Sequence, residues 1–326
     1  MRIIAIEEHM TTPLYNEHNV PTPRRLNSMR HRRELLGHDV EEELLDVSNS
    51  RVAAMNEAGI DFQMLSMTMP GPQGLPTAEG VAVALDANER MADAMRTHPT
   101  RFGAFACLPT PDVAASVKEL ERTVTKLGFK GAMINGHTNG EFLDNKKFWP
   151  IFEAAQALDV PVYMHPRDPH PCSKPYFEGY PEIASAAWGF TMDTVAHFLR
   201  LCFAGVFETF PNLKFMLGHN GEGIPFYLDR LENHTAIGMK EHGFKKTITD
   251  VMMQNVIVTT SGNFSVPALM CTVAVLGIDR VIFSVDWPYE SNKMGVEFLN
   301  SLPLSASDKE KLAHGNAEKL LGLPTA

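Results

Sequence analysis

Short, almost continuous apolar runs recur along the chain and are separated by longer amphipathic segments. Each run has the length of a buried strand and consists mostly of Val, Ile, Leu, Phe, Met and Ala. This composition is typical of parallel strands that are covered on both faces. The runs occupy residues 2–6, 62–66, 102–106, 131–134, 160–164, 213–217, 256–260 and 280–284. The pattern therefore predicts eight buried parallel strands.

The segments between these runs have helical character, and glycine or proline marks many of the junctions. The predicted helices span residues 48–58, 77–97, 112–127, 147–157, 192–208, 224–233, 266–275 and 307–321. Eight strands that alternate with helices predict an α/β fold, a (β/α)₈ TIM barrel, over residues 1–326 as one domain. The alternative is a doubly wound open sheet, but no G-x-G-x-x-G follows the first run.

Two insertions interrupt the alternation of strands and helices. Residues 10–47 follow the first strand and are rich in Arg and His, and residues 167–188 follow the fifth strand and are rich in Pro and aromatic residues. Long segments of this kind in a compact domain are usually lids or binding loops. We therefore expect both insertions to shape a binding pocket.

Composition and charge exclude several classes of function. Hydrophobic residues make up 44% of the 326 residues, and the formal net charge is −10, so no basic surplus is available for nucleic acid or an anionic membrane surface. No apolar stretch approaches the ~20 residues of a membrane span, and the N-terminal apolar run is too short for a secretory signal. The four scattered cysteines form no C-x-x-C motif. We expect a cytoplasmic protein with reduced thiols.

Polar residues able to bind a metal or move a proton stand where several predicted strands end. The first strand runs into Glu7 and His9, the fifth into His165, and the last into Asp286. In a barrel of this type the carboxyl ends of all strands meet at one rim, which carries the active site. Because side chains alternate along a strand, Glu7 and His9 are expected to point the same way and Glu8 the other way.

These four side chains have the chemistry of a site for one divalent metal. Imidazole and carboxylate groups suit Zn²⁺ or Mn²⁺ best, with Mg²⁺ as a third choice. Two histidines and two carboxylates leave a coordination position open for substrate or water. The sixth strand adds His219 and Glu222, and we predict that His219 transfers protons and that Glu222 orients it. The seventh strand adds only neutral polar residues, at 259–263.

Each candidate residue also has an ordinary structural interpretation. Glu7 could cap a helix or sit exposed at a strand end, and Asp286 could initiate the turn before Trp-Pro. His9 and His165 could be core histidines, His219 could belong to a glycine turn, and Glu222 could be an acidic first-turn residue of a helix. Their joint placement at strand ends favours a functional role. The other histidines lack that placement and are expected on the surface, among them His18, His31, His38, His98 and His137.

Taken together, these motifs resemble one branch of the amidohydrolase superfamily, the metal-dependent aromatic acid decarboxylases. Members of this branch include γ-resorcylate, 2,3-dihydroxybenzoate and 5-carboxyvanillate decarboxylases. The resemblance extends from Ile4 to about Leu321, and five blocks occur in order. The blocks are Glu7-x-His9, His165-Pro166-Arg167, Gly218-His219-x-Gly221-Glu222, Thr259-Thr260-Ser261-Gly262-Asn263 and Phe283-Ser284-x-Asp286-x-Pro288.

The resemblance implies a (β/α)₈ barrel with one divalent metal, Zn²⁺, Mn²⁺ or Mg²⁺, held by Glu7, His9, His165 and Asp286. It also implies a homodimer or homotetramer in which Arg230 reaches the substrate site of a neighbouring subunit; otherwise Arg230 is an ordinary helix-surface residue. Many hydrolases of the superfamily begin with His-x-His and carry a carboxylated Lys on the fourth strand. This chain has Glu-x-His and no Lys in that strand, so a binuclear site is not expected.

Three functional hypotheses follow for this chain. In the first, the metal chelates the carboxylate and the ortho phenolate of a small aromatic substrate, and Asp286 protonates the ring carbon that loses CO₂. In the second, the enzyme hydrolyses a lactone or an amide, with Asp286 as general base for metal-bound water. In the third, the barrel only binds a ligand or serves as an assembly subunit. The Glu-x-His motif and the missing Lys favour decarboxylation.

Overall fold

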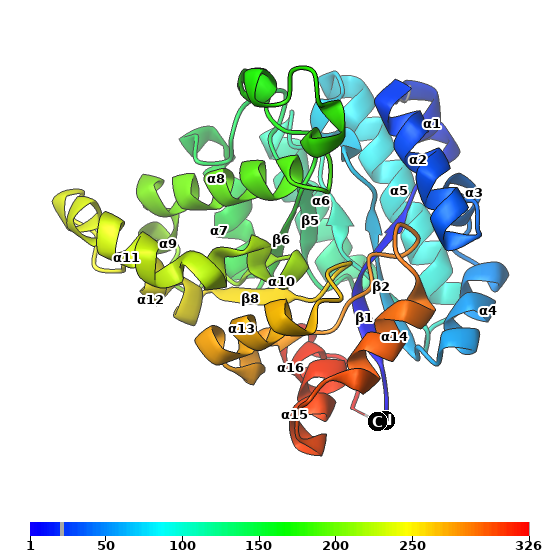
Figure 1. The fold of residues 1–326 in the computed structure, drawn as a ribbon. Coiled ribbons are helices and arrows are strands. Elements are labelled where there is room, and N and C mark those ends of the chain that lie inside the picture. The colour runs from blue at the N-terminus through cyan, green and yellow to red at the C-terminus, as the bar shows by residue number, and fades with distance from the viewer. Residues whose placement is uncertain (20–22, 326) are drawn as a thin grey trace.

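The computed structural model describes residues 1–19 and 23–325, and all of its paired strands run parallel (Figure 1). Each predicted apolar run overlaps a strand, although the third run is divided in two at Phe105. The strands are β1 (Ile4–Met10), β2 (Phe62–Met67), β3 (Phe102–Ala104), β4 (Ala106–Cys107), β5 (Ala132–Asn135), β6 (Val162–His165), β7 (Phe215–Leu217), β8 (Val256–Thr259) and β9 (Val281–Ile282).

Hydrogen bonds join the two sheets, β1-β2-β3 and β4 to β9, into one cylinder. The Phe105 N–H donates to the Leu65 carbonyl at 2.9 Å, so β3 and β4 form one nearly continuous strand. At the other seam, the Asp286 N–H donates to the Glu7 carbonyl at 3.0 Å, and the His9 N–H donates to the Trp287 carbonyl at 2.6 Å. The last strand segment therefore lies against β1, and the predicted (β/α)₈ barrel is confirmed.

Helices surround the barrel (Figure 1). The helix predicted to end at residue 233 continues to residue 241, and α12 was not predicted, although it begins with a capping box made by Thr247 and Asp250. The α-helices that follow the first insertion are α4 (Asn49–Ala58), α5 (Thr77–Thr97), α6 (Val113–Arg122), α7 (Trp149–Ala157), α8 (Gly189–Ala204), α9 (Val206–Thr209), α10 (His219–Glu222), α11 (Ile224–Glu241), α12 (Ile248–Gln254), α13 (Val266–Leu276), α14 (Asn292–Ser301), α15 (Ala306–Glu310) and α16 (Asn316–Leu321).

Both insertions lie at the rim formed by the carboxyl ends of the strands. The first insertion folds into α1 (Pro13–His18), α2 (Pro23–Leu36) and α3 (Val40–Leu45), drawn in blue in Figure 1. The second follows β6 directly and contains only 3₁₀ turns, at Pro171–Tyr176 and Pro181–Ala184.

The first insertion is attached to the segment that follows β9. The Arg32 guanidinium pairs with the Glu290 carboxylate at 2.7 Å, and His38 Nε2 lies 3.0 Å from the Pro288 carbonyl oxygen. These contacts hold the inserted helices against the loop that carries Asp286. The insertion is therefore in the position expected of a segment that shapes a pocket.

Apolar side chains fill the inside of the barrel below this rim. They include Ile6, Met64, Phe105, Tyr163 and Met216, and all of them are buried. A larger cluster fills the layer between the strands and the surrounding helices. The barrel is thus a packed core that closes the functional rim from below. No helix within the described residues combines the length and apolar character needed to cross a membrane.

Candidate metal centre

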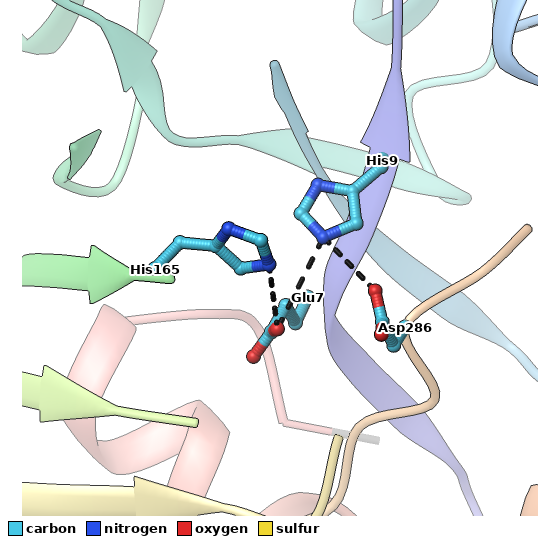
Figure 2. A group of neighbouring side chains, drawn as sticks. All are labelled: Glu7, His9, His165 and Asp286. Atoms are coloured by element: carbon cyan, nitrogen blue, oxygen red, sulfur yellow. Dashed lines mark ion pairs between the residues drawn. The ribbon is translucent and has the colours of Figure 1, made fainter. Parts of the chain in front are cut away.

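The first strand places Glu7 and His9 on the same side, as the alternation of side chains predicts. Both side chains are buried at the rim of the barrel. Ser66, which is paired in register with His9 across β1 and β2, lies with its Oγ 3.2 Å from His9 Nδ1. This contact orients the ring so that Nε2 faces the centre of the rim (Figure 2). Glu8 points away from that centre and contacts the segment after β9.

His165 at the end of β6 and Asp286 after β9 complete a compact group with these two residues. His165 Nε2 lies 3.3 Å from Glu7 Oε1, and His9 Nε2 lies 3.0 Å from Asp286 Oδ1. The four side chains point toward one another from three separate strand ends (Figure 2). Each offers one ligand atom, and these atoms all lie within 4.8 Å of one another. Residues far apart in sequence thus converge on one point.

Three atoms at this point are buried without a hydrogen-bond partner within the described residues. They are Glu7 Oε1, His9 Nε2 and Asp286 Oδ1. The second oxygen of Glu7, Oε2, accepts hydrogen bonds from the hydroxyls of Ser261 and Thr259. An unsatisfied buried polar atom costs about 1–3 kcal/mol, and more when it is charged, so three at one place indicate a missing partner. The residues fit a single divalent cation.

The electrostatics of the cluster agree with a cation site. Burial alone would raise the pKa of Glu7, but the nearby His219 and His165 outweigh it and lower the pKa. Burial, helped by His165, lowers the pKa of His9. Burial also opposes ionisation of Asp286, yet the nearby His219 and His9 imidazoles lower its pKa. Ionised carboxylates beside a neutral imidazole are the protonation states that metal binding requires.

The turn after β7 presents His219 to the same point. His219 Nδ1 lies 2.8 Å from Glu222 Oε1, while His219 Nε2 lies 3.7 Å from Glu7 Oε1 and 3.9 Å from Asp286 Oδ2. The other oxygen of Glu222 accepts a hydrogen bond from the Thr191 hydroxyl at 2.7 Å. Burial opposes protonation of His219, but Glu222 and Glu7 raise its pKa well above the usual value. The predicted pairing of His219 with Glu222 is present.

A sharply bent backbone makes this presentation of His219 possible. The turn holds five consecutive residues at positive φ, from His219 to Gly223, and Gly221 is one of them at 76°. A Cβ atom at Gly221 would come within 3.1 Å of both Pro225 and Val258. The Gly-His-Asn-Gly-Glu sequence therefore reflects a conformation that a larger residue at position 221 would strain.

Arg230 lies elsewhere in the single chain. It is exposed on α11, and within the described residues no hydrogen bond or ion pair joins it to the four clustered residues. The same helix exposes Phe226 and Tyr227. Arg230 is thus not joined to the four clustered residues of its own chain.

Two neighbours of the cluster were not anticipated from the sequence. Ser66 orients His9, as described above, and Tyr289 packs edge-on against the His9 ring with centroids 5.8 Å apart. The Tyr289 hydroxyl is hydrogen-bonded to the Thr68 hydroxyl at 2.6 Å. Their positions in the sequence could have indicated that they lie near the rim, because Ser66 ends the second apolar run and Tyr289 follows Asp286 by three positions.

The prediction that His137 lies on the surface is wrong. His137 follows β5, is only 5% exposed, and accepts a hydrogen bond at Nδ1 from the Gly140 N–H at 3.2 Å. It packs around Phe142 together with His170 and His197. We call His137, His170 and His197 the outer histidine cluster. It forms because the segment after β5 folds back against the loop after β6 and against α8.

The chain is similar to known proteins over most of its length. The profile of the amidohydrolase family matches residues 36–323. A γ-resorcylate decarboxylase from Polaromonas sp. is 35% identical over 294 residues, which cover 87% of this chain and 90% of that protein.

Solved structures of similar proteins have the same fold as this chain. A dihydroxybenzoic acid decarboxylase from Polaromonas sp., with bound manganese and the inhibitor 2-nitroresorcinol, is 34% identical with a TM-score of 0.88, covering 100% of this chain and 98% of that one. A 5-carboxyvanillate decarboxylase from Novosphingobium aromaticivorans, complexed with manganese and 4-hydroxy-3-methoxy-5-nitrobenzoic acid, is 32% identical with a TM-score of 0.88, covering 99% of this chain and 96% of that one.

Proposed function

The chain belongs to the amidohydrolase family, and on that basis we propose that it is a metal-dependent, non-oxidative decarboxylase of a hydroxylated benzoate. The observation that carries this proposal is the convergence of four ligand atoms within 4.8 Å, three of them unpartnered. The relatives that share this fold at 32–34% identity are decarboxylases of hydroxylated aromatic acids with bound manganese. The substrate is an aromatic carboxylate with a hydroxyl group ortho to the carboxylate.

In this proposal Glu7, His9, His165 and Asp286 hold one divalent metal, Mn²⁺ or Zn²⁺, with Mg²⁺ as a third choice. When bound, such a cation supplies Lewis-acid attraction for the substrate carboxylate and the ionised ortho hydroxyl. Asp286 is the most accessible of the four residues, because its side chain is 15% exposed and those of Glu7 and His9 are 0% exposed. Asp286 therefore stands nearest to an incoming substrate.

Direct loss of CO₂ from an aromatic ring would leave an unstabilised carbanion, so the ring carbon must be protonated first. Asp286 accepts the proton of the ortho hydroxyl and delivers it to the ring carbon that bears the carboxylate. The C–C bond then breaks, CO₂ leaves, and the electron pair restores the aromatic ring as a phenolate. Asp286 ends the cycle in its starting ionised form, which agrees with the lowered pKa of this carboxyl.

His219 and Glu222 act on the oxygen of the substrate. The raised pKa of His219 keeps its imidazole protonated, and Glu222 stabilises that charge through Nδ1 at 2.8 Å. His219 Nε2 donates to the ionised hydroxyl while negative charge develops, and it returns a proton to the phenolate product. The His219 side chain is 22% exposed, so water can return a proton to its imidazole. The balance is one proton consumed for each CO₂ released.

The experiment that tests the function is a substrate screen with enzyme loaded separately with Mn²⁺, Zn²⁺ and Mg²⁺. Release of CO₂ is followed for 2,6-dihydroxybenzoate, 2,3-dihydroxybenzoate and 5-carboxyvanillate, with 3-hydroxybenzoate as a control that lacks the ortho hydroxyl. We expect CO₂ from at least one ortho-hydroxylated acid and none from the control. Incorporation of labelled solvent oxygen into a lactone or amide substrate, without any release of CO₂, would instead support the hydrolase hypothesis.

Arg230 completes the proposed site from a neighbouring subunit of a homodimer or homotetramer. Phe226 is 75% exposed and Tyr227 is 52% exposed on the same helix, and the second insertion exposes Tyr176, Tyr180 and Trp188. Exposed apolar patches of this kind are typical of association surfaces. A guanidinium delivered across such a surface would bind the charged substrate.

Mixing two inactive variants tests this role of Arg230. In a hybrid of Arg230→Ala and Asp286→Asn subunits, one site receives an intact Asp286 from its own chain and an intact Arg230 from its neighbour. We expect activity to reappear on mixing, far above that of either variant alone. Absence of recovery, with hybrid formation shown by mass spectrometry, would place Arg230 outside the site.

A further inference from the structure

We call Glu7, His9, His165 and Asp286 the metal cluster. A carboxylate that faces away from the metal cluster is surrounded by hydrogen-bond donors. Glu8 is fully buried between β1 and the segment after β9. Its Oε1 accepts from the Ser284 hydroxyl at 3.1 Å and from the Val285 N–H at 3.0 Å. Its Oε2 accepts from the Trp287 N–H at 3.1 Å and from the Gln63 side chain at 3.4 Å. Glu8 thus binds the backbone on both sides of Asp286.

Asp286 needs such support because its own backbone is in an uncommon conformation. Its φ of 75° lies in the left-handed region, which a residue with a side chain occupies only when its surroundings enforce it. The Asp286 N–H donates to the Glu7 carbonyl at 3.0 Å, and the N–H groups of residues 285 and 287 are both bound by Glu8. The side chain and the main chain of β1 together fix three consecutive peptide groups.

We propose that Glu8 is a positioning residue for the reaction, which holds Asp286 in its left-handed conformation so that Oδ1 meets His9 and Oδ2 faces His219. This inference rests on the proposed role of Asp286 as metal ligand and proton carrier. The N–H groups of Val285 and Trp287 donate to the two oxygens of one carboxylate group. This fixes the orientation of the backbone at Asp286, which lies between them. Glu8 reaches neither the substrate nor the metal, and it acts only through Asp286.

The replacement Glu8→Gln separates this role from a general contribution to stability. An amide can accept hydrogen bonds at only one of its two ends, so either the Val285 or the Trp287 N–H faces an NH₂ group and loses its partner. The shorter Glu8→Asp keeps a carboxyl group with two oxygen acceptors but withdraws them from both N–H groups. The matched control is Glu119→Gln, which removes a buried carboxylate on α6 that accepts from Asn88 at 2.7 Å and from Arg122 at 2.8 Å.

The experiment measures Mn²⁺ affinity by calorimetry, kcat and KM at saturating Mn²⁺, and the melting temperature of each variant. For Glu8→Gln we expect roughly 10–100-fold losses in Mn²⁺ affinity and in kcat, with KM within about twofold of the wild type. Glu119→Gln should lower the melting temperature comparably but leave Mn²⁺ affinity and kcat unchanged. If Glu8→Gln does not fold, Glu8→Asp is judged by the same criteria.

Mn²⁺ affinity and kcat of the Glu8 variant within about twofold of the Glu119 control would overturn the inference. The calorimetric readout does not depend on identifying the substrate. A wild-type protein that binds Mn²⁺ but decarboxylates none of the tested acids would therefore count against the proposed function, while the affinity comparison would still decide the role of Glu8.

Discussion

The protein contains two groups of three buried or half-buried histidines whose ring nitrogens have different partners. Around the metal cluster, His9, His165 and His219 all direct Nε2 toward carboxylate oxygens at distances of 3.0–3.9 Å. In the outer histidine cluster, His137, His170 and His197 surround the ring of Phe142 with centroids 4.9–6.2 Å away. The two groups have the same number of imidazoles, so the difference lies in what surrounds them.

In the outer histidine cluster the ring nitrogens form hydrogen bonds with backbone groups. His137 Nδ1 accepts from the Gly140 N–H, and His170 Nε2 donates to the Gly140 carbonyl at 2.8 Å. His197 Nε2 accepts from the Leu143 N–H at 2.8 Å. The nearby Asp193 carboxylate accepts from the backbone N–H of His170 at 2.9 Å rather than from a ring. These histidines therefore anchor one loop, residues 140–143, through hydrogen bonds at their ring nitrogens.

The comparison shows that burial of histidines does not by itself indicate a metal site. Burial lowers the pKa of a histidine in both clusters. In the metal cluster it lowers the pKa of His9, and in the outer histidine cluster it lowers the pKa of His197 to about 3. Both clusters leave buried ring nitrogens unpartnered, among them His137 Nε2 and His197 Nδ1 in the outer histidine cluster. The metal cluster differs because its unpartnered His9 Nε2 faces ionised carboxylates whose own oxygens also lack a partner. Convergent, unsatisfied ligand atoms distinguish a site for chemistry from a structural cluster.

The largest expected effect comes from Asp286→Asn. The amide oxygen still binds the metal, but the side chain cannot carry a proton, so we expect kcat to fall by about 1,000-fold or more with nearly unchanged Mn²⁺ content. The matched change in the outer histidine cluster, His170→Asn, should alter kcat by less than about twofold. Steady-state kinetics with metal analysis measures both. Wild-type turnover in Asp286→Asn would remove this residue from the mechanism.

A smaller loss is expected from His219→Asn, because the metal cluster itself stays intact. We expect kcat to fall by about 100-fold and Mn²⁺ affinity to change little, since His219 is placed to move a proton and is not one of the four ligands. Glu222→Gln should lower kcat by only about tenfold, because it weakens the contact of residue 222 with His219 Nδ1 but leaves the imidazole in place. A loss of kcat in His137→Asn as large as that in His219→Asn would mean that the two clusters do not differ in function.

Binding of Mn²⁺ should stabilise the protein through the metal cluster alone. At a free Mn²⁺ concentration of 100 times Kd, linkage predicts about 2.7 kcal/mol of added stability and a melting temperature higher by several degrees. Chelation should reverse the effect, and His165→Asn should abolish most of it. His197→Gln should retain it fully. Differential scanning fluorimetry with and without Mn²⁺ compares the three proteins, and equal shifts in all of them would place the ion elsewhere.

The sequence predicted the barrel and the metal cluster because both follow from periodic features. Apolar runs define the strands, and a barrel brings the ends of all its strands to one rim, so Glu7, His165 and Asp286 could be grouped without knowing any loop. The outer histidine cluster was missed because it depends on how the segment after β5 folds onto α8. The partners of Glu8 were missed for a similar reason, since Ser284 lies 276 positions away in sequence.

The smallest effect concerns the pH dependence of stability in the outer histidine cluster. Burial lowers the pKa of His197 to about 3. Its Nε2 already accepts from the Leu143 N–H, so a proton on Nε2 would face that N–H and break the hydrogen bond. The unfolded chain takes up a proton at His197 near pH 6.5, whereas the folded chain does not until about pH 3. Stability contributed by the neutral ring is therefore present above pH 6.5 and is lost as the pH falls, by up to about 1.4 kcal/mol per unit.

The variant His197→Gln isolates this contribution, because the amide oxygen can accept from Leu143 but does not titrate. Near pH 7.5 we expect the variant to be less stable than the wild type by about 1–2 kcal/mol. Between pH 6.5 and pH 5 that difference should shrink, since only the wild type loses stability through this ring. Urea unfolding across this range measures both curves. Parallel curves would mean that His197 titrates alike in the folded and unfolded chains, and that burial does not keep its ring neutral.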